Sequence, residues 1–194
     1  MAARLNLGDT INDLYVLRLG PFDRTTADRL LLELSATYSF PLAEKVRAHL
    51  LDRIGWLVPY YVQLLFRELR AHCIEREATP TPGEADAVFE DLVSPAKKSY
   101  FDYWRQRLNE ELGKPDAGHA LVLLNAAAQD PKGTSASTLS QGLAEHIQEP
   151  ARRGESLRYL LDVLEGDGYL VQDGDRYRFR SPLLREFWLR RIVP

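Results

Sequence analysis

The sequence predicts a mainly α-helical protein that carries one small β-hairpin near its C-terminus. Apolar residues recur at helical spacing through most of the 194 residues, as in the stripe within residues 27–34. Two short stretches, 169–172 and 176–180, have strand character, and the second alternates strictly between apolar and basic residues. Asp173-Gly174, which lies between them, is a dipeptide typical of hairpin turns.

The N-terminal part is expected to begin with an extended segment, residues 14–22, and to continue with five helices. Gly55 stands where a C-terminal stop of the second helix is expected, and Pro59 occupies a first position that favours the third. Thr81 and Glu84 form a capping box that starts the fourth helix. The helices are predicted from about residue 25, at 41–55, at 59–75, from 82 to about 92, and at 94–113.

A change of pattern after GKPDAG, residues 113–118, marks the expected domain boundary. One domain covers residues 1–114 and a second covers residues 115–194. In the second domain, helices at 119–129, 137–147 and 155–168 precede the hairpin, and a last helix follows at 182–191. Three helices followed by a two-stranded wing is the order of a winged-helix domain, an elaborated helix-turn-helix.

The bulk composition restricts the classes of function. A net charge of −3 gives no overall attraction to nucleic acid or to an anionic membrane. The single cysteine, Cys73, rules out an internal disulfide and fits a reducing compartment. No apolar run approaches the roughly 18 residues that span a bilayer, and the N-terminus lacks the apolar core of a signal peptide. We expect a soluble, cytoplasmic protein with no membrane partner.

The sequence offers no catalytic constellation. The near-match to a phosphate-binding loop has His119 and Ala120 where a lysine and a serine or threonine are required. The adjacent carboxylates Glu90 and Asp91 lie inside the capped fourth helix, where we expect them to be solvated. The four histidines are scattered, whereas zinc requires three or four converging ligands. We therefore expect no enzyme activity, no catalytic residues and no metal site in this chain.

Four stretches, taken in order, carry a resemblance to a known family. They are INDLYVLRLGPFDRTTADRLLLELS, IGWLVPYYVQLLFREL, YFDYWRQRL and YRFRSPLLREFWLRR. Together they resemble the C-terminal half of a prokaryotic AAA-type P-loop ATPase, of the branch related to the STAND (signal-transduction NTPase) group. In that family a helical lid and a winged-helix domain follow the nucleotide-binding core. The resemblance covers residues 11–191 and implies a fold that is mainly α: a helical lid-like bundle followed by a winged-helix domain with a small β-hairpin.

The family's P-loop, Walker B strand and sensor strand precede the segment that corresponds to residues 11–19. The chain thus resembles a lid plus winged helix without the ATPase core, and ATP is implied only for an intact relative, with no cofactor for this chain alone. The stretch GWLVP matches the region where the lid touches the nucleotide, which makes Gly55, Trp56 and Pro59 candidate nucleotide contacts. Three residues separate Gly55 from Pro59, where the usual pattern has one. We therefore favour their other role, that of ending one helix and starting the next.

Basic residues of the second domain form the remaining candidate site, a surface for nucleic acid or for a protein partner. The candidates are Arg152, Arg153, Arg158, Arg176, Arg178 and Arg180. Alternation puts the last three on one face of the second strand. However, the outward face of the candidate recognition helix carries one positive charge against three negative, and the hairpin tip DGD is acidic, which disfavours contact with phosphates. We therefore expect a protein partner ahead of duplex DNA.

The function that we expect is a non-catalytic regulatory or interaction module of an AAA/STAND-type ATPase. It would couple a P-loop ATPase core, in cis or in trans, to a protein or nucleic-acid partner. The alternative is a DNA-binding winged-helix regulator whose N-terminal helices mediate dimerisation. An enzyme of unknown mechanism comes third, because no catalytic constellation is present.

Overall fold

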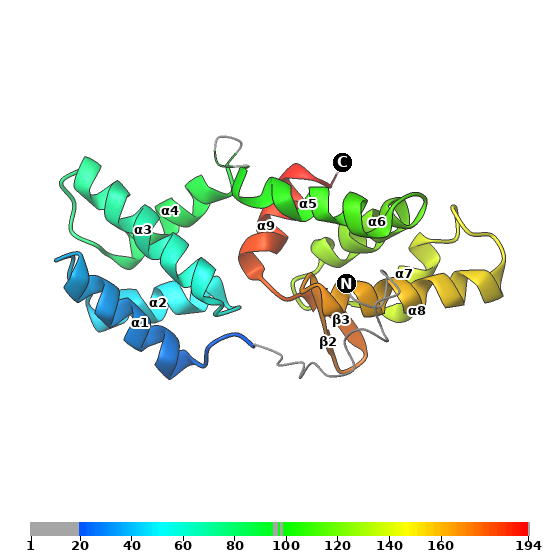
Figure 1. The fold of residues 1–194 in the computed structure, drawn as a ribbon, viewed down its shortest axis with the longest axis horizontal. Coiled ribbons are helices and arrows are strands. Elements are labelled where there is room, and N and C mark those ends of the chain that lie inside the picture. The colour runs from blue at the N-terminus through cyan, green and yellow to red at the C-terminus, as the bar shows by residue number, and fades with distance from the viewer. Residues whose placement is uncertain (1–19, 95–96, 98, 194) are drawn as a thin grey trace, which may run out of the picture.

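The structure is a computed structural model that describes residues 20–94, 97 and 99–193. The helices of this part are α1 Arg24–Thr37, α2 Glu44–Ile54, α3 Pro59–Glu75, α4 Pro82–Leu92, α5 Ser99–Leu112, α6 Asp116–Gln129, α7 Ala136–Gly142, α8 Pro150–Gly166 and α9 Pro182–Arg191. The strands are β1 Thr134–Ser135, β2 Leu170–Asp173 and β3 Arg176–Phe179. Figure 1 shows an elongated molecule, with α1–α4 gathered at one end and α5–α9 and the strands at the other. The predicted mainly helical fold with a small hairpin is confirmed, whereas most of the extended segment expected at residues 14–22 lies outside the described residues.

The helices of the first group, α1–α4, begin and end where the local sequence predicts. α2 ends at Ile54, followed by Gly55 with a φ of 64°, and α3 begins at Pro59. The Thr81 hydroxyl accepts a hydrogen bond from the backbone N–H of Glu84 at 3.2 Å, which confirms the Thr81 half of the capping box predicted for α4. The Glu84 carboxylate lies 2.6 Å from Nε2 of His72 and therefore ties α4 to α3.

The second group contains the predicted hairpin and one strand that the sequence analysis missed. β2 and β3 pair antiparallel, with Leu170 opposite Phe179. β1 pairs antiparallel with the other edge of β3, so the strand order is β1-β3-β2. β1 has two residues, too few to show an alternating pattern. The helix predicted at 137–147 ends at Gly142, and α8 begins at Pro150 and not at residue 155, because proline is well suited to the first turn of a helix.

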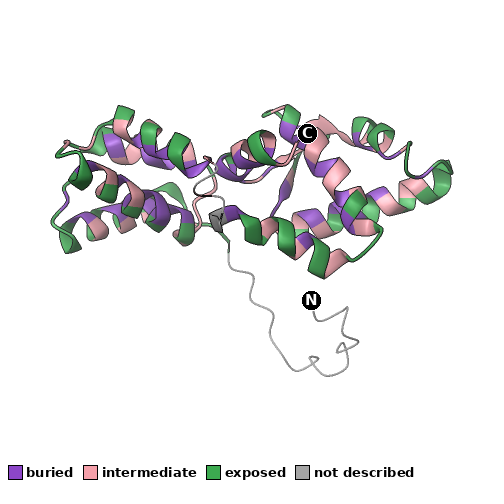
Figure 2. Ribbon diagram, turned by 90° about the horizontal axis from the view of Figure 1, so that it is seen from above, coloured by how far each residue is buried: buried purple, intermediate pink, exposed green. Residues whose placement is uncertain are grey.

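Each helix turns an apolar face inward, and the buried residues form a core that runs through both groups (Figure 2). The predicted core face of α8 is confirmed, as is that of α9. The buried residues of these two helices are Leu157, Leu160, Leu161, Leu164, Leu183, Leu184, Phe187 and Trp188. In the part of the chain that the structure describes, no helix combines the length and the apolar character needed to cross a lipid bilayer.

Helix α5 packs its aromatic side chains mainly against other elements of the second group. Phe101 stacks on Phe187 of α9 with 4.6 Å between ring centroids, and Trp104 meets Tyr169 edge-on at 4.9 Å. The boundary that we predicted between residues 114 and 115 stays a prediction. In space, the side chains of α5 belong to the core of the helices that follow it.

We expect Gly55→Ala to destabilise the fold more than Gly113→Ala. Both glycines have positive φ, 64° and 66°, which should cost an alanine about 1–2 kcal/mol in the free energy of unfolding. A β-carbon at Gly55 would also lie 2.7 Å from Cγ of Pro182, whereas a β-carbon at Gly113 would meet nothing within 4 Å. This overlap with a rigid ring should add about 1–3 kcal/mol. Urea unfolding of the two variants measures the difference, and equal losses would show that the Pro182 contact imposes no constraint.

Candidate functional site

The turn between α2 and α3 holds two of the candidate nucleotide contacts, and it packs against the second group. Gly55 approaches Pro182, the first residue of α9, so closely that a β-carbon would overlap the proline ring. The Trp56 ring covers the turn between α8 and β2, where a β-carbon at Gly168 would lie 3.0 Å from Trp56 Cη2. The guanidinium carbon of Arg180 lies 5.7 Å from the Trp56 ring centroid, within cation–π range. The two groups of helices therefore meet at the Gly55-Trp56 turn.

The third candidate nucleotide contact, Pro59, begins α3, and Val58 before it has the extended backbone of an N-cap residue. Trp56 is half-buried, and its indole Nε1 is buried without a hydrogen-bond partner in the described part of the chain. These positions support the role of Gly55 and Pro59 at helix ends. A nucleotide contact by Gly55, Trp56 or Pro59 stays a prediction.

An aromatic cluster continues inward from Trp56 and joins the two groups. Its members come from the α2–α3 turn, α3, α5, the α8–β2 turn, β3 and α9: Trp56, Tyr61, Trp104, Tyr169, Phe179 and Trp188. The Tyr169 hydroxyl donates to the backbone carbonyl of Trp104 at 2.6 Å, and Trp188 Nε1 donates to Asn125 Oδ1 at 2.9 Å. Burial raises the pKa of Tyr61 and of Tyr169 far above the ordinary value of a phenol, so both side chains are neutral at physiological pH.

The three candidate arginines of the hairpin all have partners within the chain. Arg176 Nη1 lies 3.2 Å from Asp130 Oδ2 and also donates to the Gly133 carbonyl oxygen at 2.5 Å. Arg178 Nε lies 3.2 Å from Asp173 Oδ2. Arg180, which follows β3, lies over the Trp56 ring as described above. Arg176 and Arg180 thus hold the hairpin to its surroundings, and Arg178 links its two strands, so the three side chains do not form an unengaged basic face.

The candidate arginines of α8 differ in their surroundings. Arg153 Nη1 donates to the Ile147 carbonyl oxygen at 3.0 Å and so closes the loop before the helix. Arg158 reaches back to the carbonyl oxygen of Gly154 at 3.5 Å. Arg152 is exposed and lines a pocket of about 640 Å³. Residues of both charge signs line this pocket, namely Asp116, His119, His146, Glu149, Arg152 and Glu155.

Two histidines of this pocket lie near each other. Ring centroids of His119 and His146 lie 5.9 Å apart, and His119 Nδ1 lies 3.9 Å from Asp116 Oδ1. Within residues 20–94, 97 and 99–193, no group of three or more His, Cys, Asp or Glu side chains is arranged to hold a metal ion.

A chain of ion pairs also joins the two groups, and the sequence analysis missed it. Arg190 of α9 lies 2.6 Å from the Glu90 carboxylate of α4, and Arg53 of α2 lies 3.7 Å from the same carboxylate. Arg53 and His49 both approach Asp86, at 3.1 and 2.9 Å. The prediction that Glu90 is merely solvated is wrong, because its partner Arg190 is 100 residues away in the sequence. No local pattern signals such a pair.

The Glu90–Arg190 pair predicts a pH-dependent stability. The hydrogen bond from Arg190 holds the pKa of Glu90 below its ordinary value of about 4.3. The contribution of the pair is therefore fully present above the pKa of the unfolded chain and is lost as the pH falls through the lower folded value. Because about half of the Glu90 side chain is exposed, at 52 %, we expect Glu90→Gln to cost at most about 1 kcal/mol at pH 7.

Urea unfolding at pH 7 and at pH 3 tests this expectation, since the difference between the wild type and Glu90→Gln should shrink at the lower pH. Asp91→Asn is the matched control, because Asp91 is the exposed neighbour of Glu90 on α4. A Glu90→Gln variant as stable at pH 7 as Asp91→Asn would contradict the role of the pair.

Comparison with solved structures gives a likeness in fold. No protein-family model matches the chain, and no curated protein matches its sequence. Among solved structures, the chain is similar to a Walker-type ATPase of Pyrococcus abyssi, with a TM-score of 0.58 at 17 % sequence identity. The match covers 97 % of this chain and 49 % of the other, so the chain spans about half the length of that ATPase. The chain therefore shares its fold with about half of that Walker-type ATPase.

Proposed function

We propose that this chain is a non-catalytic regulatory or interaction module of an AAA/STAND-type ATPase. In this proposal α1–α4 belong to a lid that responds to the nucleotide state of a P-loop core. The elements from α6 to α9 form a winged-helix domain that passes the response to a partner. The order α6-β1-α7-α8-β2-β3-α9, with a hairpin between the last two helices, supports the winged-helix assignment. The similarity in fold to half of a Walker-type ATPase supports the relation to a P-loop core.

The observation that carries the proposal is the packing of the Gly55-Trp56 turn against Gly168 and Pro182. Because an added β-carbon would overlap Pro182 at Gly55 and would lie tightly against Trp56 at Gly168, the first group cannot move closer at this point without displacing the second. The Trp56 ring packs against Gly168, in the turn after α8, and Gly55 packs against Pro182, the first residue of α9. A motion of the lid would therefore reach both α8 and α9.

Hydrolysis of ATP by a P-loop core tests the coupling. The core to use is the one encoded in frame with this chain or beside it. Joining the chain to the core, or adding it in trans, should change the hydrolysis rate several-fold. Trp56→Ala should abolish most of this change, whereas Tyr103→Ala, which removes a side chain that is 61 % exposed on α5, should preserve it. An unchanged rate with and without the chain would refute the coupling role.

The chain alone should neither bind ATP measurably nor hydrolyse it. In its near-match to a phosphate-binding loop, His119 and Ala120 occupy the positions where a lysine and a serine or threonine are required. Titration of the chain with Mg-ATP in a calorimeter should give only heats of dilution. Binding with a micromolar Kd would contradict the assignment of nucleotide binding to a separate core.

Duplex DNA is the weaker candidate partner, because Arg176, Arg178 and Arg180 already have partners within the chain. A mobility-shift experiment with a random duplex at low salt should show no complex at tens of micromolar protein. Non-specific DNA-binding proteins usually reach a Kd of about 10⁻⁴ to 10⁻⁶ M even at physiological salt. A shift in this range that disappears in an Arg152→Glu, Arg158→Glu double variant would favour the DNA-binding alternative.

A further inference from the structure

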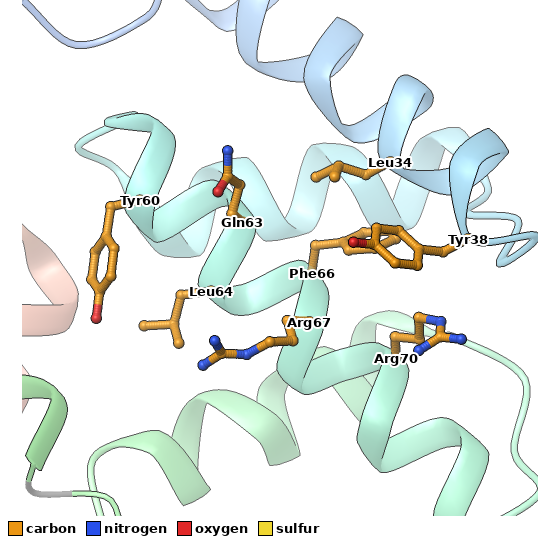
Figure 3. Close-up of a pocket in the computed structure, with 8 residues that line it drawn as sticks. All are labelled: Leu34, Tyr38, Tyr60, Gln63, Leu64, Phe66, Arg67 and Arg70. Carbon is orange, nitrogen blue, oxygen red and sulfur yellow. The ribbon is translucent and has the colours of Figure 1, made fainter.

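A groove between α1 and α3 lies apart from the contacts that join the two groups. Figure 3 shows its walls: Leu34 projects from α1, Tyr38 follows directly after the end of α1, and the other side chains follow one another along α3. Its volume is about 400 Å³. The lining residues are Leu34, Tyr38, Tyr60, Gln63, Leu64, Phe66, Arg67 and Arg70. Tyr38 and Tyr60 are 50 % and 54 % exposed, unusual values for large aromatic side chains.

The shape of the groove fits a row of side chains from a partner helix. Tyr60 and Arg70 are ten residues apart on α3, so the stripe between them is about 15 Å long at the rise of an α-helix. At about 400 Å³ the groove is smaller than a helix segment of this length, which at a diameter of about 10 Å occupies roughly 1,200 Å³. A helix with its side chains is about 10–12 Å across and does not enter such a space. The apolar stripe of an amphipathic helix can enter while its backbone stays outside, which is the helix-in-groove mode of recognition.

The charge of the groove favours an acidic occupant. None of its lining residues is acidic. The guanidinium carbon of Arg70 lies 5.2 Å from the Tyr38 ring centroid, and its buried Nε has no hydrogen-bond partner in the described part of the chain. Nη2 of Arg67 lies 3.0 Å from Oε1 of Glu68, and Nζ of Lys97 lies 2.7 Å from Oε2 of the same carboxylate. The Glu68 carboxylate therefore faces two cations. Arg70 is thus held by a ring in a place where a partner's carboxylate can reach it.

We propose that this groove binds an acidic amphipathic helix of a protein partner. The partner's apolar side chains insert between Leu34, Tyr38 and Leu64, and a carboxylate one or two turns further along pairs with Arg70. The groove has exposed tyrosines and an arginine around an apolar floor. Tyrosine and arginine are among the residue types that contribute most to the affinity of protein interfaces. The proposal concerns the chain alone and does not depend on coupling to an ATPase core.

Selection from a displayed library of helical peptides against the full chain provides the test. The selected peptides should combine leucine or phenylalanine at helical spacing with at least one Asp or Glu. Binding of a synthetic selected peptide is then measured by fluorescence anisotropy. Arg70→Glu and Tyr38→Ala should each weaken it at least tenfold, and Arg70→Glu should bind the Glu→Lys counterpart of the peptide better than the wild type does.

Two exposed residues of α5 supply matched controls, since Arg105→Glu and Tyr103→Ala make the same changes outside the groove and should alter the affinity less than twofold. The proposal is overturned if no peptide is enriched, if the enriched peptides lack acidic residues, or if Arg70→Glu and Tyr38→Ala bind like the wild type. Sedimentation velocity checks a further outcome: a wild-type dimer that Tyr38→Ala converts to a monomer would identify a second copy of this chain as the occupant and overturn the proposal. None of these outcomes requires an ATPase core, so they leave the test of coupling intact.

Discussion

The contact of the Gly55-Trp56 turn with Gly168 and Pro182 is the constraint on which the arrangement of the two helix groups depends. Gly55 lies against the ring of Pro182, and Gly168 lies against the ring of Trp56, so at both places the chain backbone itself comes close to its partner. The proline ring has no other rotamer that could relieve the contact with Gly55. A close-packed contact of this kind transmits displacement, because its surroundings compress little. Helix α3 begins shortly after one side of this contact, and α9 begins at the other side, at Pro182. The contact therefore ties the direction of one helix to that of the other.

The aromatic cluster stabilises this junction more than the ion pairs do. An aromatic pair contributes about 0.5–1.5 kcal/mol beyond the area that it buries. Of the five contacts that run from Tyr61 through Trp56 to Phe179, the Trp56–Trp104 contact crosses between the two groups, and the others extend it into the core on either side. The Glu90–Arg190 pair is half exposed, and pairs of this kind contribute about 0–1 kcal/mol. Trp188 is fully buried, and loss of its hydrogen bond to Asn125 would leave an unsatisfied buried group at a cost of about 1–3 kcal/mol. The ion pairs orient α9 against α4, and the aromatic rings hold the two groups together.

The sequence predicted those features whose causes are local. Pro59 and Pro182 begin α3 and α9 as expected, because proline fixes the backbone of a first helical turn without losing a hydrogen bond. β1 was missed because two residues become a strand only when β3 lies beside them. The partner of Glu90 was missed because Arg190 is distant in the sequence and reaches Glu90 only through the fold. The candidate nucleotide contacts were found by resemblance, but their packing against Gly168 and Pro182 depends on a tertiary contact that no local pattern encodes.

The arginines of this chain show why the charge of a stretch is a poor guide to what its surface binds. Arg176, Arg178 and Arg190 each contact a carboxylate within the chain. To bind a phosphate they would first have to leave these partners, so the stretch contributes less to association than its count of charges indicates. Arg70 differs, because its contact with Tyr38 leaves its charge without an acid among the described residues. A partner carboxylate there would gain a charge-assisted hydrogen bond without displacing one. The isolated arginine of the first group is therefore a better candidate for recognition than the arginine-rich C-terminus.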